Sequence, residues 1–174
     1  LVQVMDTAFY FGLIDKKYHA AELKSAIVKG LTDSISLLEA DRLYTDAAIA
    51  IFKDIYHGYK KPPWVGYDQL SAKYADTDNE YLLDGLLKTQ TTGQFKLFID
   101  LLEPQHKEYI ALKNEFRKQK EKKAEDTVAF LQISMNYYRW IHHFSFDRFI
   151  VINLPAAQLQ YYEKDSVIIN MKIV

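Results

Sequence analysis

The pattern of apolar residues changes near Phe146, and this change constrains the fold more than any other feature of the sequence. Before that point apolar residues recur at intervals of three and four, which is typical of helices. From Arg148 to Leu154 they form a nearly continuous run rich in β-branched residues, and Pro155 ends it. Such a run predicts a strand that is buried on both faces. We therefore expect a helical part followed by a β part.

A β-hairpin is expected after Pro155. Polar and apolar residues alternate from Gln158 to Tyr162 and again from Val167 to Ile173, on either side of a polar turn at Glu163 to Ser166. Alternation of period two across a short polar turn predicts two paired strands. The sequence stops at Val174 within the second of them, which would leave strand edges unpaired, so we expect the sheet to continue in further sequence.

The composition is ordinary for a soluble globular protein and excludes several kinds of site. The chain has 174 residues, 49% of them hydrophobic, and a formal net charge of -1, so nothing favours nucleic acid or an anionic membrane as a partner. It contains no cysteine, which excludes thiol catalysis, disulfides and cysteine-ligated metal within these residues. No apolar run approaches the roughly 18 residues that a membrane-spanning helix needs.

The helical part is expected to pack around a helix from Ile35 to Tyr56. Its middle, residues 47–52, is apolar nearly all the way round, which is typical of the central helix of a bundle. Two short helices are expected before it, with a break at Gly12. Further helices are expected after it. One is capped by residues 76–79, one covers residues 95–102 and is closed by Glu103 and Pro104, and the next has Pro104 in its first turn. The last has an apolar face of Phe130, Ile133, Tyr137 and Ile141, with Trp140 flanking it.

Charged residues are concentrated in two places. Glu39, Arg42 and Asp46 lie three and four residues apart, which predicts a charged stripe along one helix face that is either solvated or a seam between helices. Residues 117–126 are almost wholly charged, with lysines and glutamates mixed. They are expected to form an exposed helix end or a mobile connection rather than a basic binding patch.

Residue patterns that carry common chemistry are missing from the sequence. It has no glycine-rich phosphate loop, no HExxH helix, no GxSxG turn and no EF-hand loop. His142 and His143 are adjacent, so on a helix their side chains diverge by about 100° and do not share a metal ion as an i, i+4 pair does. The residues alone therefore predict no catalytic residue, no metal ligand and no cofactor.

One stretch of the helical part is suited to contact a ligand or a partner. Residues 59–67 are rich in proline and aromatic residues, and Tyr59, Trp64 and Tyr67 are the candidate contact residues. Their rings can stack on sugars or pack on a protein surface. The alternative is structural, with Trp64 covering the core beneath a rigid loop, and it is favoured because aromatic side chains are buried far more often than they bind ligands.

Four segments of the sequence carry a resemblance to a known family. They are residues 43–47 with 56–58 following, residues 81–98 with 101–104, residues 136–140 (NYYRW), and residues 149–155 (FIVINLP) followed by 159–163. In these segments the chain resembles the two-part murein L,D-transpeptidases of bacterial envelopes, and most closely their Bacteroidetes-type members. The last two segments are the more specific.

The resemblance implies a mainly α chain with a helical scaffold domain over residues 1–145, followed by the opening strands of a YkuD-type catalytic domain over residues 146–174. Members of this family cross-link peptidoglycan. A cysteine thiolate, activated by a nearby histidine, attacks a tetrapeptide stem and passes the acyl group to an amine of a neighbouring stem. That cysteine lies in a Ser-His-Gly-Cys segment downstream of the strands, so no catalytic residue carries over to this sequence.

By the same resemblance, this part of the protein positions the catalytic domain or its substrate and is not itself catalytic. The implied partners are peptidoglycan and the chain's own catalytic domain, and the implied location is the periplasmic side of the bacterial cell envelope. Two other functions fit the residues. One is a stand-alone helical interaction or glycan-binding module of the envelope. The other is a muramidase-like hydrolase, for which Asp46 or Glu39 would have to be a buried general acid in a cleft.

Overall fold

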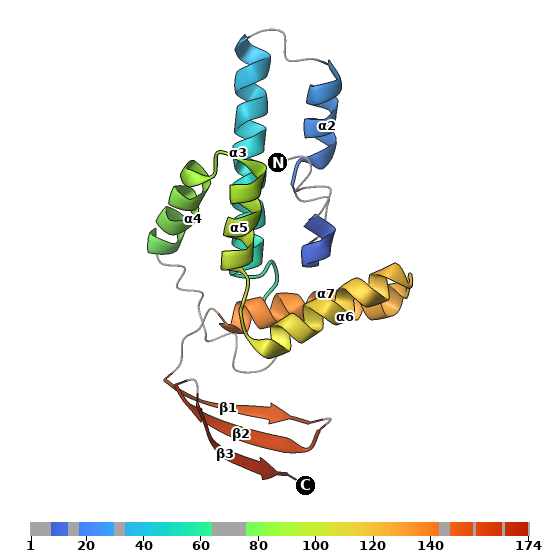
Figure 1. The fold of residues 1–174 in the computed structure, drawn as a ribbon, viewed down its shortest axis with the longest axis vertical. Helices are drawn as coiled ribbons and strands as arrows, with labels where there is room; N and C mark the ends of the chain where they lie inside the picture. The colour runs from blue at the N-terminus through green and yellow to red at the C-terminus, as the bar shows by residue number, and fades with distance from the viewer. Residues whose placement is uncertain are drawn as a thin grey trace. The chain divides into compact units, whose positions relative to one another are not determined.

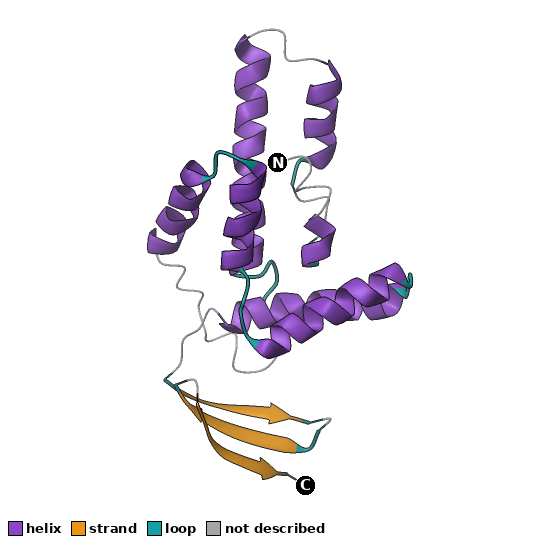
Figure 2. Ribbon diagram, viewed as in Figure 1, coloured by secondary structure: helices purple, strands orange, loops and turns teal. Residues whose placement is uncertain are grey.

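The structure is a computed structural model that describes residues 8–13, 18–29, 34–63, 76–142, 147–154, 156–164 and 166–173. Contacts between residues divide the chain into two compact units, Leu1–His143 and Phe144–Val174. The first is helical and the second is a small antiparallel sheet (Figures 1 and 2), so the predicted mainly α fold with a C-terminal β segment is confirmed. The predicted boundary between residues 145 and 146 lies outside the described residues.

The helical unit is built around α3 (Ser34–Tyr56), which agrees with the central helix predicted from the sequence. The 3₁₀ helix η1 (Ala8–Phe11) and α2 (Ala20–Lys29) precede it, while α4 (Asp76–Lys88) and α5 (Thr92–Leu102) follow it. Figure 1 shows α5 running alongside α3. Their shared core consists of Leu13, Tyr18, Leu23, Ala47, Ala48, Ile51, Phe52, Ile55, Leu82, Phe95, Ile99 and Leu102.

The helices α4 and α5 approach each other closely at Gly85. A Cβ atom at this position would overlap the ring of Phe98, so the approach requires a glycine. Phe98 also packs edge-on against Phe52 of α3, with their ring centroids 5.0 Å apart. At the start of α5, Thr91 Oγ1 accepts a hydrogen bond from the Gln94 amide at 3.2 Å, and Gln94 Oε1 accepts one from the Thr91 amide at 3.1 Å. This capping box fixes where α5 begins.

The helices α6 (Lys107–Glu121) and α7 (Glu125–His142) form an antiparallel pair joined by a short turn (Figure 1). Lys123 adopts a φ of 56° in that turn. The charged residues 117–126 therefore belong to the end of α6, the turn and the start of α7, which confirms the predicted exposed helix end. A second apolar cluster of Tyr109, Phe116, Leu131 and Met135 lies between the two helices. No helix in the described part of the chain is both long and apolar enough to span a bilayer.

The predicted apolar face of α7 is wrong. Its buried residues are Leu131, Met135, Asn136, Arg139 and Trp140, whereas the Phe130 side chain is 67% exposed. Of the residues predicted on or beside that face, only Trp140 is buried. The spacing of apolar residues does not reveal that Asn136 and Arg139 are buried, because polar side chains can be buried when they form hydrogen bonds.

The prediction that Glu103 and Pro104 close one helix is confirmed, but the predicted place of Pro104 in the first turn of the next helix is wrong. Helix α6 begins at Lys107 with His106 as its N-cap, so Pro104 lies in the link after α5. Glu103 before it has an extended backbone, with φ -74° and ψ 146°. This is the conformation that a following proline imposes, and it ends α5 rather than starting α6.

The second unit is a three-stranded antiparallel sheet in the order β1-β2-β3 (Figure 1). Its strands are β1 (Arg148–Asn153), β2 (Gln158–Glu163) and β3 (Ser166–Lys172), so the strand and the hairpin predicted from the sequence are confirmed. Tyr161 of β2 lies opposite Ile150 of β1 and Ile169 of β3. The ring of Phe149 stacks on that of Tyr162, with centroids 4.7 Å apart.

The predicted burial of β1 on both faces is wrong. Ile150 is 60% exposed and Val151 is 41% exposed, and their side chains point to opposite faces of the sheet. The physical reason is that the described residues of this unit form a single layer of sheet, and none of them adds a second layer that covers either face.

Candidate functional site

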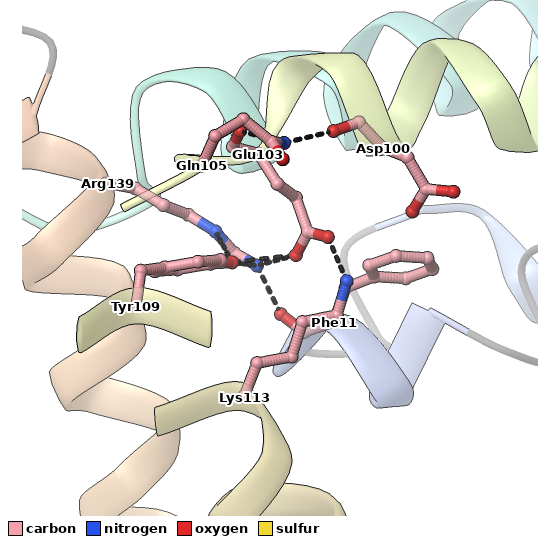
Figure 3. A network of polar contacts seen from close by, with 7 residues as sticks. All are labelled: Phe11, Asp100, Glu103, Gln105, Tyr109, Lys113 and Arg139. Atoms are coloured by element: carbon pink, nitrogen blue, oxygen red, sulfur yellow. Dashed lines mark hydrogen bonds and ion pairs between the residues drawn. The ribbon is translucent and has the colours of Figure 1, made fainter. Parts of the chain in front are cut away.

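A buried polar network joins four segments of the helical unit (Figure 3). Arg139 of α7 is fully buried, and its Nη2 donates to the backbone oxygen of Phe11 and to the hydroxyl of Tyr109, each at 2.6 Å. The Tyr109 hydroxyl donates to Glu103 Oε1 at 2.7 Å, and Lys113 forms an ion pair with Glu103 Oε2. The network therefore links η1, the end of α5, α6 and α7.

The charged groups of this network form ion pairs with one another. Arg139 Nη2 lies 3.3 Å from Glu103 Oε1, while Arg139 Nη1 has no hydrogen-bond partner among the described residues. Burial raises the pKa of the Tyr109 hydroxyl above its ordinary range; the Arg139 charge opposes this rise and the Glu103 carboxylate adds to it. The arrangement keeps Tyr109 protonated as a donor to Glu103. Its role is to hold the helices together.

A second buried contact joins the segment before α2 to the end of α3. The Tyr18 hydroxyl donates to Asp54 Oδ2 at 2.7 Å, and both side chains are buried. Burial raises the pKa of Tyr18 well above its ordinary range, and the neighbouring Asp54 carboxylate raises it further. This contact stabilises the fold while Tyr18 stays protonated.

The stretch of residues 59–67, called the aromatic loop from here on, is anchored at its start on α7 by Asn136. Its Oδ1 accepts hydrogen bonds from the amides of Tyr59 at 2.6 Å and Lys60 at 3.0 Å, and its Nδ2 donates to the Lys60 oxygen. Gly58 turns the chain into this contact with a φ of 76°. A Cβ atom on Gly58 would lie 2.7 Å from the Asn136 backbone oxygen, so the turn requires glycine. The first residues of the loop are thus fixed by the body of the unit.

A groove of about 360 Å³ lies between α3 and the turn that joins α4 to α5. Four of its lining residues follow one face of α3 at positions i, i+3, i+4 and i+7. The remaining six come from the end of α4, the turn and the start of α5. The lining residues are Asp41, Tyr44, Thr45 and Ala48 on one side, and Leu86, Thr89, Gln90, Thr91, Thr92 and Phe95 on the other.

The groove has an apolar floor and a polar rim. Ala48 and Phe95 are buried at its base, while Asp41, Thr45 and Gln90 are exposed at its edge. The rim is partly used for local structure, since the Thr89 hydroxyl donates to the Leu86 backbone oxygen at 2.7 Å and Thr91 caps α5. By contrast, within the described residues no hydrogen bond involves the side chains of Asp41, Tyr44, Thr45, Gln90 or Thr92, which leaves these groups available to a ligand.

A comparison with known protein families gives a match that covers most of the helical unit. The family model of the Scaffold domain matches residues 1–116. The chain belongs to this family. No curated protein and no solved structure matches the chain. The part matched to the Scaffold domain contains both walls of the groove, the Tyr59 end of the aromatic loop and Glu103, and it ends within α6, while Arg139 lies beyond it.

Of the three predicted contact residues of this Scaffold domain protein, Tyr59 is among the described residues. Tyr59 is half-buried and packs against the core around α3. Burial raises the pKa of its hydroxyl and the Arg139 charge opposes that rise. Trp64 and Tyr67 lie outside the described residues, so the ligand or partner role of the three residues stays a prediction.

The charged stripe on α3 is solvated, which is the first of the two arrangements predicted for it. Glu39, Arg42 and Asp46 are all exposed, so neither carboxylate is the buried general acid that a muramidase-like hydrolase would need. In the described ranges, no group of three or more His, Cys, Asp or Glu side chains is placed to hold a metal ion.

Sequence reasoning missed both the network and the groove. The network joins residues as far apart as Phe11 and Arg139, and no local pattern links them. The groove left a weak signal in the sequence, because polar Asp41 and Thr45 share a helix face with Ala48, and the threonine-rich residues 89–92 mark a turn.

Proposed function

We propose that this chain is the scaffold part of a cell-wall L,D-transpeptidase, and that it positions a catalytic domain that cross-links peptidoglycan stem peptides. The observation that carries the proposal is the match of residues 1–116 to the Scaffold domain. The helical unit supports it because the buried polar side chains of Glu103, Tyr109 and Arg139 bind helices to one another instead of converging on a substrate. In this function the helical unit acts in the periplasm and is inactive by itself.

The sheet supports the same proposal. Its exposed apolar side chains lie on both faces, with Ile150 and Val151 on β1 and Ile168 and Ile169 on β3. A complete β domain covers such faces, because exposed apolar strands promote aggregation. We therefore assign the sheet to the catalytic domain, whose Ser-His-Gly-Cys segment is expected to follow it in the sequence.

The protein encoded by the complete reading frame provides the test. It is incubated with a disaccharide tetrapeptide, and cross-linked dimers are detected by mass spectrometry. We expect dimers with the complete protein, and none with its variant in which the cysteine of the Ser-His-Gly-Cys segment is replaced by alanine or with the present chain alone. A reading frame without such a segment, or a complete protein that forms no dimers, would contradict the proposal.

The alternative is a stand-alone interaction or glycan-binding module of the envelope. The groove on α3 favours this function, because its available polar side chains suit a small polar ligand. Sedimentation of the chain with purified peptidoglycan sacculi tests binding, and Trp64→Ala tests the aromatic loop. A folded Trp64→Ala chain that no longer sediments would assign glycan contact to the loop, whereas loss of folding would assign Trp64 to the core.

A further inference from the structure

The groove between α3 and the α4–α5 turn has the dimensions of a ligand site. Its volume of about 360 Å³ falls within the range of roughly 300–1,000 Å³ that small-molecule sites occupy. Both walls belong to elements with fixed packing, since Ala48 and Phe95 are part of the central core and α5 begins at a complete capping box. The floor of the groove is therefore held in place by the packed core, which lowers the entropic cost of binding a ligand there.

The charges of the groove exclude an anionic ligand. Among the described residues that line it there is no lysine, arginine or histidine, and the one charged side chain is the Asp41 carboxylate. Asp41 is exposed, and an ion pair between solvated groups contributes little binding free energy, so a cationic ligand gains little from it. The ligand that the lining favours is neutral and rich in hydrogen-bonding groups.

The arrangement of polar and apolar surface matches a sugar ring. A pyranose has an apolar C–H face and hydroxyl groups around its edge, and the groove places apolar Ala48, Leu86 and Phe95 beneath a rim of hydroxyl, amide and carboxylate groups. Tyr44 is half-buried beside this floor and presents an aromatic ring of the kind on which sugars stack. An N-acetylated sugar adds a methyl group, for which the lining offers apolar Ala48, Leu86 and Phe95, and an amide, for which it offers the polar side chain of Gln90.

We infer that this groove binds an uncharged chain of N-acetylated amino sugars, which in the envelope is the glycan strand of peptidoglycan. The choice of glycan strand rests on the proposed function, whereas the sugar chemistry rests on the groove. In this arrangement the scaffold holds the strand while its neighbouring domain acts on the attached peptides. Tyr44 stacks on a sugar ring, and Asp41, Thr45 and Gln90 bond its polar edge.

The test uses the present chain, labelled with nitrogen-15, and tetra-N-acetylchitotetraose as the probe. We expect saturable amide shifts in heteronuclear spectra at Thr45, Gln90 and Thr92 during the titration. Thr45→Arg places a long side chain across the groove and is expected to raise the Kd by about tenfold or more. Asp46→Arg is the matched control, because the next position on α3 points about 100° away and does not line the groove. It is expected to change the Kd by less than about twofold.

Three outcomes would overturn the inference. The first is the absence of saturable shifts up to a probe concentration of about 10 mM. The second is equal weakening by Thr45→Arg and Asp46→Arg when circular dichroism shows both variants folded. The third is a response at the groove to a free stem tetrapeptide but not to the sugar, which would make it a peptide site. The titration needs no catalytic domain, so its result and that of the cross-linking assay are independent.

Discussion

Arg139 connects more segments than any other side chain of the buried polar network. Its guanidinium contacts the Phe11 backbone, the Tyr109 hydroxyl and the Glu103 carboxylate. Arg139→Met roughly keeps the side-chain volume, but it removes hydrogen-bond donors from the Phe11 backbone oxygen and from the buried Glu103 carboxylate. Removing one partner of a buried ion pair costs about 3–5 kcal/mol, and we expect a loss of at least about 3 kcal/mol in the free energy of unfolding.

Urea unfolding followed by circular dichroism measures this loss. The control is Arg117→Met on α6, where the arginine is exposed, and its free energy of unfolding is expected to change by less than about 0.5 kcal/mol. Similar losses in the two variants would mean that the network does not hold the helices together.

Tyr18 makes the stability of the helical unit depend on pH in the alkaline range. Burial, and then the Asp54 carboxylate, raise the pKa of its hydroxyl in the folded chain. In the unfolded chain the same group ionises near its ordinary pKa of about 10. Unfolding above that pH therefore releases a proton, so the contribution of Tyr18 is complete below a pH of about 10 and falls as the pH rises further.

Tyr18→Phe is expected to reduce this pH dependence. The variant loses about 1 kcal/mol at neutral pH with the hydrogen bond to Asp54. Its free energy of unfolding should then fall less steeply than that of the parent chain in urea titrations between pH values of about 9 and 11. Identical slopes would show that the Tyr18 hydroxyl titrates alike in the folded and unfolded chains.

At the scale of single residues, the sequence predicted exposed charges better than buried ones. The stripe of Glu39, Arg42 and Asp46 was predicted correctly, because its spacing on one helix face is a local property. Asn136 and Arg139 were not predicted as buried. Their partners lie 77 and 128 positions away in the sequence, at Tyr59 and Phe11, and only the tertiary fold brings them together.

Among the elements, α4 and α5 depend on the absence of a side chain at Gly85. The Phe98 ring occupies the space where a Cβ would stand, and it packs against Phe52 and Tyr81 with ring centroids 5.0 and 5.7 Å apart. Gly85→Ala forces this ring out of the core. Overpacking of this kind costs about 1–3 kcal/mol, and we expect that loss in the free energy of unfolding.

Gly93→Ala is the matched control for this substitution. Gly93 is also helical, but a Cβ there meets only Thr91 Oγ1, at 3.9 Å. We expect no loss, or a gain of about 0.4–1 kcal/mol from reduced freedom of the unfolded chain. Equal destabilisation by the two substitutions in urea unfolding would exclude the close approach as the cause.

Elements were predicted where the signal was local. The long apolar middle of α3 and the alternation of β2 and β3 were sufficient, because each is a property of consecutive residues. The start of α6 and the burial of β1 were predicted wrongly. The start of α6 depends on the path of the chain through Pro104 after α5 has ended. The burial of β1 depends on whether another layer covers the sheet. Neither is a property of the segment itself.

At the scale of the whole molecule, the two units differ in how much apolar surface they bury. All residues of the two apolar clusters lie between Leu13 and Met135, within the helical unit. Because burial of apolar surface is the main favourable term in folding, this unit has its own source of stability. We expect a chain that ends at His142 to keep its helical circular dichroism spectrum and a cooperative urea transition. A non-cooperative transition would show that the helical unit needs the sheet.

The sheet is expected to behave in the opposite way. Among its described residues none is buried, and apolar side chains such as Ile152 and Ile168 are more than half exposed. Its hydrogen bonds alone do not offset the conformational entropy that folding removes, since a net backbone hydrogen bond contributes about 1 kcal/mol and ordering one residue costs about as much or more. A peptide of residues 147–174 should therefore give the spectrum of an unfolded chain. If the sheet belongs to the proposed catalytic domain, the same peptide extended to the whole of that domain should gain strand signal. A sheet that forms in the short peptide would show that it is a complete unit, and would remove its support for the transpeptidase assignment.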